Sequence, residues 1–432
     1  TPGAKRLSEQ ASKPKSRGLF SWWFGITLWK RIFLAVVAGA IAGYFWGEGA
    51  QQIKWMGDVF VRLIRMIVVP LVFITLVAGV AAMGDLRRLG SIGVKAMTLY
   101  VLTSIIAVAI GLGLGVGLQP GAGVDIAGAT PRETDTAVSV ADLLMNIIPI
   151  NPVAALAAGD MLAIIFFAVL VGAGILVAGE RGKSVGQFFD HGSDVLLGAT
   201  RLVMETAPFG VFALIAWVMG TSGPQAFVSV FTLAVAVYGG CLLHILFVQG
   251  GLVRLLANLP ALRFFRDITE AQLVAYSTSS SAATLPVTIR VAEKNLGIKT
   301  PIASSVLPLG ATVNMDGTAM YVALVALFSA QIFGVELALA DYGIIMLTTV
   351  LVSIGTASVP SASLFMLAAV LQAIGISAEQ TALVVGFILP FDRILDMMRT
   401  ATNVTGDLAV ATTVARWENE IDLDQFRAKA QE

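Results

Sequence analysis

The sequence predicts an all-α protein that crosses a membrane several times. Of its 432 residues, 57% are hydrophobic and only 13% are charged, and the mean hydropathy is +0.84. As helices, apolar runs such as Met66–Met83 and Met97–Leu118 are long enough to cross the hydrocarbon core of a bilayer, which is about 30 Å thick. A soluble enzyme would have to hide all of this apolar surface in its core, so the composition argues against that class.

Eight segments are expected to span the membrane. They are residues 28–48, 55–84, 94–119, 139–179, 195–222, 225–253, 300–333 and 378–418. The fourth is too long for one crossing, and its Asn146–Pro152 stretch contains two prolines, so we expect a break there.

Two further apolar stretches, residues 258–294 and 340–374, are interrupted in the middle by small polar residues. The interruptions are Ser277–Pro286 and Gly355–Ser363. Each half is too short to cross a bilayer, and a loop between spans would need neighbouring charges. Each stretch therefore predicts a re-entrant helical hairpin. Paired interrupted segments in matching halves of inverted repeats are typical of secondary transporter sites.

Basic residues set the expected orientation. They precede the first span (Lys5, Arg6, Lys13, Lys15 and Arg17) and recur after alternate spans, as at Arg87 and Arg88. The positive-inside rule then places both termini in the cytoplasm, with a basic tail at residues 1–27 and a short tail at 421–432. The formal net charge is zero, which argues against nucleic acid as a partner.

A stripe of polar residues lies in the eighth predicted span. Asp392, Asp396, Arg399, Asn403 and Asp407 are spaced by four, three, four and four residues, and therefore share a helix face about 80° wide. Placing one charge at the centre of a bilayer costs at least about 2.5–3.5 kcal/mol. The stripe must therefore face a ligand, an ion or another part of the protein.

The seventh predicted span is interrupted by Asn314-Met-Asp-Gly-Thr318, a sequence that favours a turn. An unwound segment frees carbonyl groups, which together with the Asp316 carboxylate are hard ligands suited to Na⁺. This span and the stripe together contain four acidic residues and one arginine, Arg399. The difference is about three negative charges, so several cations are expected to bind. His191 and His244 are isolated in the sequence and are expected to be structural.

The stripe also suggests the substrate. The guanidinium of Arg399 offers a planar fork for a carboxylate, and Asp396, one turn earlier, can hold an ammonium group. Helix N-termini at the hairpin tips, with Ser280, Ser281 and Ser361, can hold a second carboxylate. These groups together suit an acidic amino acid. Two alternatives stay open: an internal Arg399–Asp396 ion pair, and protonated or structurally paired carboxylates, for which Asp392 is the best candidate.

Several motifs together resemble those of the glutamate transporter family, the dicarboxylate/amino acid:cation symporters. They are Asn314–Thr318, the serine-rich segment that ends in Thr284–Pro286, Gly355-Thr356 with Pro360, and Asp392–Asp407. The resemblance runs from about residue 28 to 420. It implies a homotrimer in the bilayer that works by alternating access.

The resemblance also implies a division into two domains. Residues 28–93 and 139–222 would form the scaffold. Residues 94–119 and 225–420 would form a transport domain that moves as an elevator. This transport domain would contain both hairpins.

By the same resemblance, Arg399, helped by Thr318, binds the side-chain carboxylate of the substrate and Asp396 binds its ammonium. Asn403 with Ser281 would bind the α-carboxylate, and Thr400 would shape the site. The full implied substrate set is Ser279, Ser280, Ser281, Thr318, Val359, Ser363, Asp396, Arg399, Thr400 and Asn403.

Three sodium sites are implied in the same way. Tyr100, Thr103 and Ser104 share a helix face, although hydroxyls inside spans usually bond their own backbone. The first implied site combines these hydroxyl residues with Asn314 and Asp316. The second consists of Asp407 with the carbonyls of Gly310, Asn314 and Asn403. The third consists of the carbonyls of Thr312, Ser353, Ile354 and Thr356.

The resemblance therefore implies a Na⁺-coupled symporter of L-aspartate or L-glutamate in the cell (inner) membrane, with Na⁺ as the coupling ion. Family members that carry dicarboxylates lack the acid that Asp396 represents, and those that carry neutral amino acids replace the arginine that Arg399 represents. The alternatives are a proton-coupled glutamate or C4-dicarboxylate carrier and an anion-conducting channel. An enzyme is the weakest alternative, because no nucleophile–base pair is evident.

Overall fold

The computed structural model describes residues 26, 28–82, 90–123, 148–159, 161–223, 225–353 and 362–427. These residues are almost entirely helical, and their one β-pairing is an isolated bridge between Ile298 and Ile421. The all-α prediction is confirmed. The α-helices are α3 (Leu28–Trp46), α4 (Lys54–Ala82), α6 (Ser91–Leu118), α8 (Pro152–Ala158), α9 (Met161–Ala178), α10 (Lys183–Met204), α11 (Ala207–Ser222), α12 (Gln225–Leu243), α13 (Ala261–Thr278), α14 (Ser281–Lys294), α15 (Thr300–Val313), α16 (Asp316–Ile332), α17 (Leu339–Ser353), α18 (Ala362–Ala373), α19 (Ala378–Trp417) and α20 (Leu423–Arg427).

Short helices of other types complete the described chain. The 3₁₀-helices η2 (Gly47–Ile53) and η3 (Gly179–Gly182) connect longer helices, and η4 (His244–Gln249) and η5 (Leu252–Leu256) are π-helical continuations of α12. Helices of the π type are rare and are found most often at functional sites.

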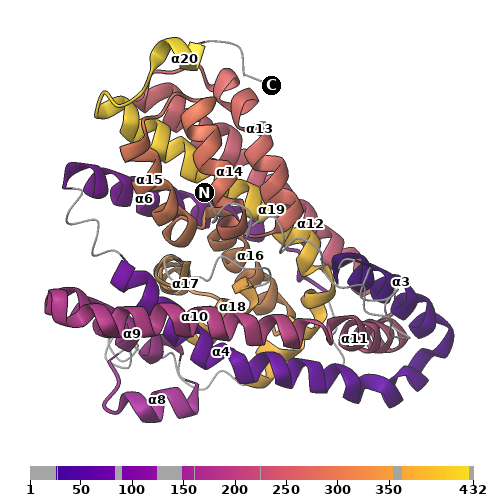
Figure 1. Ribbon diagram of the computed structural model, residues 1–432. Helices are drawn as coiled ribbons and strands as arrows, with labels where there is room; N and C mark the ends of the chain where they lie inside the picture. Colours follow the sequence, from indigo (N-terminus) through magenta and orange to yellow (C-terminus); the bar gives the residue numbers. More distant parts are fainter. Residues whose placement is uncertain are drawn as a thin grey trace, which may run out of the picture.

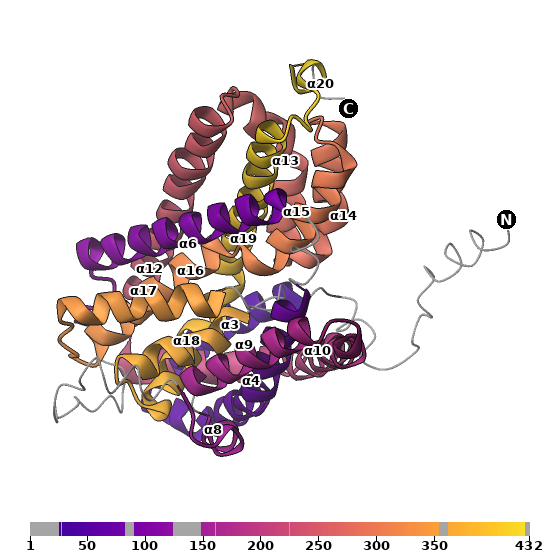
Figure 2. The ribbon, with the colours of Figure 1, turned by 90° about the vertical axis from the view of Figure 1, so that its left-hand side faces the viewer.

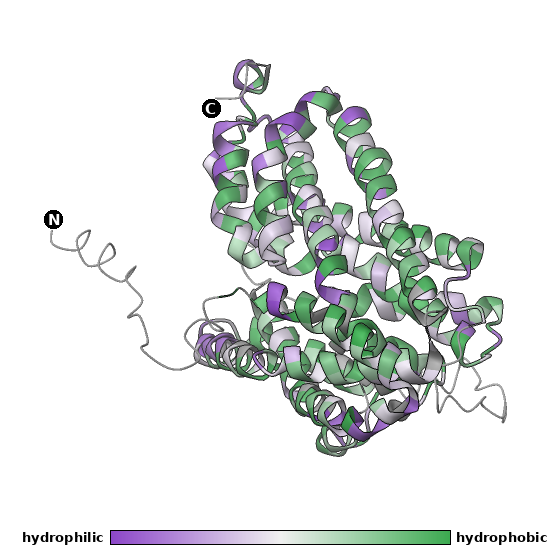
Figure 3. Cartoon of the chain, turned by 90° about the vertical axis from the view of Figure 1, so that its right-hand side faces the viewer, coloured by the Kyte–Doolittle hydropathy of each residue, from purple (hydrophilic) through white to green (hydrophobic). Residues whose placement is uncertain are grey.

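Several described helices are suited to a membrane. Lys30–Phe60, Ser91–Leu118, Val228–Leu256 and Thr300–Ile332 are each long and apolar enough to span it, and a fifth span forms if Phe166–Met204 and Ala207–Thr221 count as one bent pair. Figure 3 shows hydrophobic residues along most of the helices, with hydrophilic residues near α20 and on several other helices. The structure is thus that of a multi-pass membrane protein, and the count of eight spans stays a prediction.

Two of the predicted spans differ from the structure. The segment 195–222 is not one helix, because α10 ends at Met204 and Pro208 begins α11 near its N-terminus, where a proline costs no hydrogen bond. The segment 139–179 is described from residue 148 onward, and there the helix is interrupted at Gly159, whose φ is +72°. The predicted break at Asn146–Pro152 lies partly outside the described residues.

The helices form two groups in the chain's packing (Figures 1 and 2). In one group, α3 packs against α11, and α4 packs against α9, α10 and α11. In the other, α19 packs against α12, α13, α15 and α16, while α6 packs against α16. The groups meet where α18 and α19 contact α4. The functional division into scaffold and transport domain stays a prediction.

The first interrupted stretch forms a pair of packed helices, α13 and α14. They are joined at Ser279, which has a left-handed φ of +52°, and at Ser280, whose Oγ caps α14 by accepting from the Ala283 N–H at 3.2 Å. The second stretch likewise forms the packed helices α17 and α18, and its tip at residues 354–361 lies outside the described residues. Entry of either pair into a membrane as a re-entrant hairpin stays a prediction.

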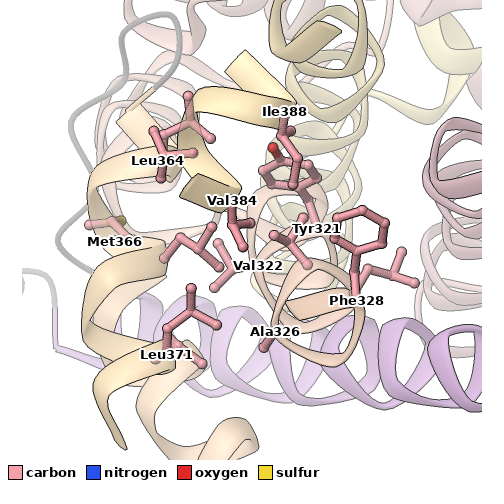
Figure 4. Packing of buried hydrophobic residues seen from close by; sticks show 14 of the residues in the cluster. Tyr321, Val322, Ala326, Phe328, Leu364, Met366, Leu371, Val384 and Ile388 are labelled. Carbon is pink, nitrogen blue, oxygen red and sulfur yellow. The ribbon is translucent and has the colours of Figure 1, made fainter. Parts of the chain in front are cut away.

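Helix α16 is the centre of the larger hydrophobic core. Its residues Tyr321, Val322 and Phe328 pack against α18 and α19, as the close view in Figure 4 shows for Leu364 and Ile388. Because α16 is buried from Asp316 to Ala330, any polar group at its start is also removed from solvent.

Helix α19 is 40 residues long and carries the whole polar stripe. It begins with a capping box, in which Ser377 Oγ accepts from Gln380 N–H at 3.2 Å and Gln380 Oε1 accepts from Ser377 N–H at 3.0 Å. Beyond its end, Lys95 and Ser91 of α6 donate to Glu418 and lower the pKa of that carboxyl. These contacts fix the helix against α6, which brings the hydroxyl triplet of α6 next to the stripe.

Candidate substrate and cation site

The five residues of the stripe are all buried, and they face the interior of the protein. Arg399 and Asp392 have no exposed surface, and Asp396, Asn403 and Asp407 are almost completely covered. Charges buried this deeply are stable only when paired and hydrogen-bonded. The prediction that the stripe faces partners rather than lipid is therefore confirmed.

Arg399 lies between two carboxylates. Its Nη1 is 3.0 Å from Asp392 Oδ1 and its Nη2 is 2.8 Å from Asp396 Oδ1. Its guanidinium also covers the ring of Tyr321 at 3.8 Å, and the Tyr321 hydroxyl donates to Asp392 Oδ1 at 3.0 Å. The structure thus shows both ion pairs that the sequence left as alternatives: Arg399 with Asp396, and Asp392 as a structural partner.

Some buried donors of the implied substrate set have no protein acceptor. Within the described part of the chain, Arg399 Nε and the buried hydroxyls of Ser279 and Ser363 lack a hydrogen-bond partner. Unpaired buried donors are costly, and they usually mark a place where a ligand or water belongs. Thr400 is also buried, but no polar contact places it in the cluster.

Asn403 joins the stripe to the start of α16. Its Oδ1 accepts from the Gly317 N–H at 2.8 Å, and its Nδ2 lies 3.4 Å from Thr318 Oγ1. Only glycine fits at 317, because a Cβ there would lie 2.5 Å from the carbonyl oxygen of Arg399. The implied substrate residues Arg399, Asn403 and Thr318 are therefore brought together.

The chain unwinds at Asn314 and Met315, as the sequence predicts. Helix α15 ends just before them, and α16 begins just after them at Asp316. Asp316 Oδ1 accepts from Ser104 Oγ at 2.9 Å and from Thr103 Oγ1 at 3.3 Å. Thr103 Oγ1 also lies 3.4 Å from Asn314 Oδ1 and 3.1 Å from the carbonyl oxygen of Tyr100, so its single proton has three acceptors within reach. Carboxylate, amide and hydroxyl oxygens thus converge, which is the donor chemistry that Na⁺ takes.

His244, although isolated in the sequence, has a buried partner in the structure. Its Nε2 is 2.9 Å from Asp316 Oδ2, and both side chains have no exposed surface. Gln249 also approaches Asp316 Oδ2 at 3.5 Å and donates to Thr402 O at 3.0 Å. Both residues lie on η4, which is π-helical. Because a π-helix is hydrogen-bonded between residues five apart, His244 and Gln249 lie on the same face.

No motif marks these two residues in the sequence. The available signal was a histidine and a glutamine, five residues apart, in a segment that is otherwise apolar. His191, the other histidine, is exposed on α10.

Asp407 lies on the other side of Asn314. Its Oδ1 accepts from Asn314 Nδ2 at 3.0 Å, and a Cβ at Gly310 would lie 2.6 Å from both Asp407 Oδ1 and the Tyr100 hydroxyl. Tyr100 itself donates to the carbonyl of Val306 at 3.0 Å. The members of the first and second implied sodium sites are therefore neighbours.

Of the third implied site, the structure describes only Thr312 and Ser353. The side chain of Thr312 is exposed and donates to Leu309 O, and Ser353 donates to Val350 O. Ile354 and Thr356 lie outside the described residues, as does the implied substrate residue Val359. This site stays a prediction.

A second arginine changes the predicted charge balance. Arg393 Nη2 donates to the carbonyl of Thr278 at 3.2 Å, and Arg393 lies next to Asp392 in α19. With Arg393 included, the four carboxylates face two guanidiniums, so the predicted excess of about three negative charges falls to about two.

A helical membrane protein with a buried, charged site of this kind is a carrier of polar solutes. The sequence profile of the sodium:dicarboxylate symporter family matches residues 28–417, and the chain belongs to that family. The protein is accordingly a transporter rather than an enzyme, and the family resemblance of the sequence is confirmed.

Named relatives cover nearly the whole chain. A proton/sodium-glutamate symport protein of Bacillus caldotenax is 36% identical over 93% of this chain and 98% of its own length. A proton/glutamate-aspartate symporter of Bacillus subtilis (strain 168) is 35% identical over 90% of this chain and 94% of its own length. A C4-dicarboxylate transport protein of Rhizobium etli is 34% identical over 92% of this chain and 91% of its own length.

Proposed function

We propose that this protein is a secondary active symporter that takes up L-aspartate or L-glutamate together with Na⁺. The observation that carries the proposal is the buried Arg399–Asp396 pair, with 2.8 Å between Nη2 and Oδ1. A substrate with a side-chain carboxylate and an ammonium group would bind by separating these two charges, because it would exchange one ion pair for two. Succinate has no ammonium group. If it bound to Arg399, the Asp396 carboxylate would be left without a positively charged partner.

The other substrate contacts follow from the same arrangement. The unpaired Nε of Arg399 can donate to the substrate carboxylate, and Asn403 with Ser281 would receive the α-carboxylate. Thr318, already 3.4 Å from Asn403 Nδ2, lies beside them. Ser280 is the N-cap residue of α14, and the N–H groups of that helix N-terminus favour an anion.

Two sodium ions would be bound near Asn314. The oxygens of Asp316, Asn314, Thr103 and Ser104 would hold one, and Asp407 would hold the other. The name of the Bacillus caldotenax relative includes protons, sodium and glutamate, and its mention of sodium supports this coupling. Co-transported cations would neutralise the two carboxylates that no guanidinium pairs.

The test is uptake of radiolabelled L-aspartate into proteoliposomes under three conditions: an inward Na⁺ gradient, K⁺ or choline in place of Na⁺, and a proton gradient alone. We expect uptake only with Na⁺, blocked by excess L-aspartate and not by succinate. Uptake that ignores Na⁺ and follows the proton gradient would contradict the proposal.

A proton-coupled glutamate or C4-dicarboxylate carrier is the second candidate. It is favoured by the names of the Bacillus subtilis and Rhizobium etli relatives, which mention protons or C4-dicarboxylates. The same experiment separates the two, because this candidate predicts uptake driven by protons and, for a dicarboxylate carrier, competition by succinate.

We also propose that the protein is a homotrimer in the cell (inner) membrane with both termini in the cytoplasm. The transport domain would comprise α6 and α12–α19 and would move as an elevator against a scaffold of α3, α4 and α8–α11. Helix packing within each of these groups supports the division. Light scattering of the purified protein checks the assembly, since a trimer has three times the chain mass of 45.3 kDa.

A further inference from the structure

A polar contact fastens the end of α13 to α19, next to the site described above. Arg393 Nη2 donates to the carbonyl oxygen of Thr278, the last residue of α13, at 3.2 Å. The last carbonyls of a helix have no partner within it and carry a partial negative charge. A guanidinium therefore suits this position by both hydrogen bonding and charge.

A second contact joins the same two helices through α12. The Tyr238 hydroxyl donates to the carbonyl of Ile394 at 2.9 Å and lies 3.2 Å from the Tyr276 hydroxyl. Since the proton of Tyr238 is directed to Ile394, Tyr276 is the donor to Tyr238. We call the four residues Arg393, Thr278, Tyr238 and Tyr276 the α13–α19 clasp.

The clasp lies one residue away from the site on both helices. On α13, Thr278 is followed by Ser279, which is buried and has a φ of +52°. A residue with a side chain adopts this conformation only when its surroundings impose it. On α19, Arg393 follows Asp392 directly and precedes Asp396 by one turn.

We propose that Arg393 is a positioning residue for the substrate. It fixes the α13 end of the hairpin, and thereby Ser279–Ser281, relative to the Asp396–Arg399 pair. It also supplies a second positive charge beside Asp392 and Asp396, which leaves Arg399 able to turn toward a substrate carboxylate. The inference rests on the proposed function, because it assigns a residue to the same acidic substrate.

The test uses Arg393→Gln, which keeps much of the side-chain volume and removes the charge. We expect the KM for L-aspartate to rise about tenfold, the size of effect for losing a hydrogen bond to a charged group, with the maximal rate per transporter changed much less. Arg393→Lys keeps the charge and loses the fork, and should recover part of the affinity. Tyr238→Phe removes the second contact of the clasp and should raise the KM in the same direction by less.

The matched control is Arg290→Gln. Arg290 is an exposed arginine on α14 that pairs with Glu270 of α13, within the same hairpin and away from α19. Its loss should leave the KM unchanged. A general loosening of the hairpin would instead raise the KM in both arginine variants and would overturn the proposal.

Two negative results are distinguishable. If the unmodified protein shows no uptake of acidic substrate, the proposed function and this inference both fail. If the unmodified protein transports L-aspartate and the KM of Arg393→Gln stays within twofold of it, the inference alone fails. Should Arg393→Gln not reach the membrane, an unchanged KM in Tyr238→Phe overturns the inference in the same way.

Discussion

At the scale of single residues, Arg399 is the most constrained side chain in the site. It is buried, pairs with two carboxylates and covers an aromatic ring, so three neighbours depend on its charge. The spacing of charged residues in the sequence was enough to predict that this residue faces partners, because nothing else can stabilise a cation inside an apolar helix bundle.

We expect Arg399→Ala to abolish binding of acidic substrates. It should also lower the free energy of unfolding by about 3–5 kcal/mol, because Asp392 and Asp396 would be left buried without their cation. Isothermal titration with L-aspartate and thermal unfolding in detergent check the two effects. Unchanged aspartate affinity in this variant would refute the site.

We expect Asp407→Asn to shift the Na⁺ dependence of uptake to higher concentration. The variant keeps the volume of the side chain and removes the charge that would attract a cation, next to Asn314 Nδ2 at 3.0 Å. A Na⁺ titration of L-aspartate uptake measures the shift. A titration curve that overlaps the unmodified protein's would exclude Asp407 as a ligand.

His244→Asn tests the contact that the sequence did not reveal. The shorter side chain cannot reach Asp316 Oδ2 from the same backbone position, which leaves one carboxylate oxygen without its partner. We expect a loss of about 1–3 kcal/mol in stability and a weaker Na⁺ response. His191→Asn is the control, because His191 is exposed on α10. Equal behaviour of the two variants would show that the His244 contact has no role.

At the scale of elements, the interruptions were more predictable than the uninterrupted helices. The turn-forming sequence Asn314–Thr318 predicts the break that the structure has at Asn314 and Met315, and Ser277–Pro286 predicts the turn at Ser279 and Ser280. Clusters of small polar residues favour turns over continuous helix, and in apolar sequence they stand out clearly, which is why these predictions hold.

Other features of the helices could not be predicted in this way. The residues of the π-helical η4 are equally compatible with an α-helix. The register of η4 depends on its packing against α19 and α6, and the periodicity of the sequence carries no information about that packing. The division between α10 and α11 did leave a signal at Pro208, but an apolar segment with a proline is equally compatible with a kinked single span.

Close contact between α16 and α19 gives a prediction at this scale. A Cβ at Gly317 would lie 2.5 Å from Arg399 O, so Gly317→Ala must push the two helices apart and should cost about 1–3 kcal/mol. Gly343→Ala on α17 has nothing within 4 Å of its new methyl group and should be neutral or slightly stabilising. Thermal unfolding of both variants makes the comparison. Equal melting temperatures would show that the helices yield without cost.

At the scale of the whole molecule, composition alone gave the class of protein. Phe45, Phe247 and Leu255 are among the large apolar side chains left more than two-thirds exposed, which is expected where lipid takes the place of water. The number of crossings was harder to predict, since half-length helices, bent pairs and interrupted spans have similar hydropathy. The family resemblance already implied that α6 lies beside the start of α16, whereas the packing of α3 against α11 came only from the structure.

Both the oxygen and the nitrogen of the Asn314 side-chain amide make contacts in the site. Its oxygen faces Thr103 beside Asp316, and its nitrogen donates to Asp407. A cation that draws the oxygen toward itself must therefore change the field at Asp407, and a cation at Asp407 must act back on the first position by the same factor, because thermodynamic coupling between two sites is reciprocal. In the proposed two-cation carrier, this amide group couples the two positions, so that the affinity at one depends on whether the other is filled.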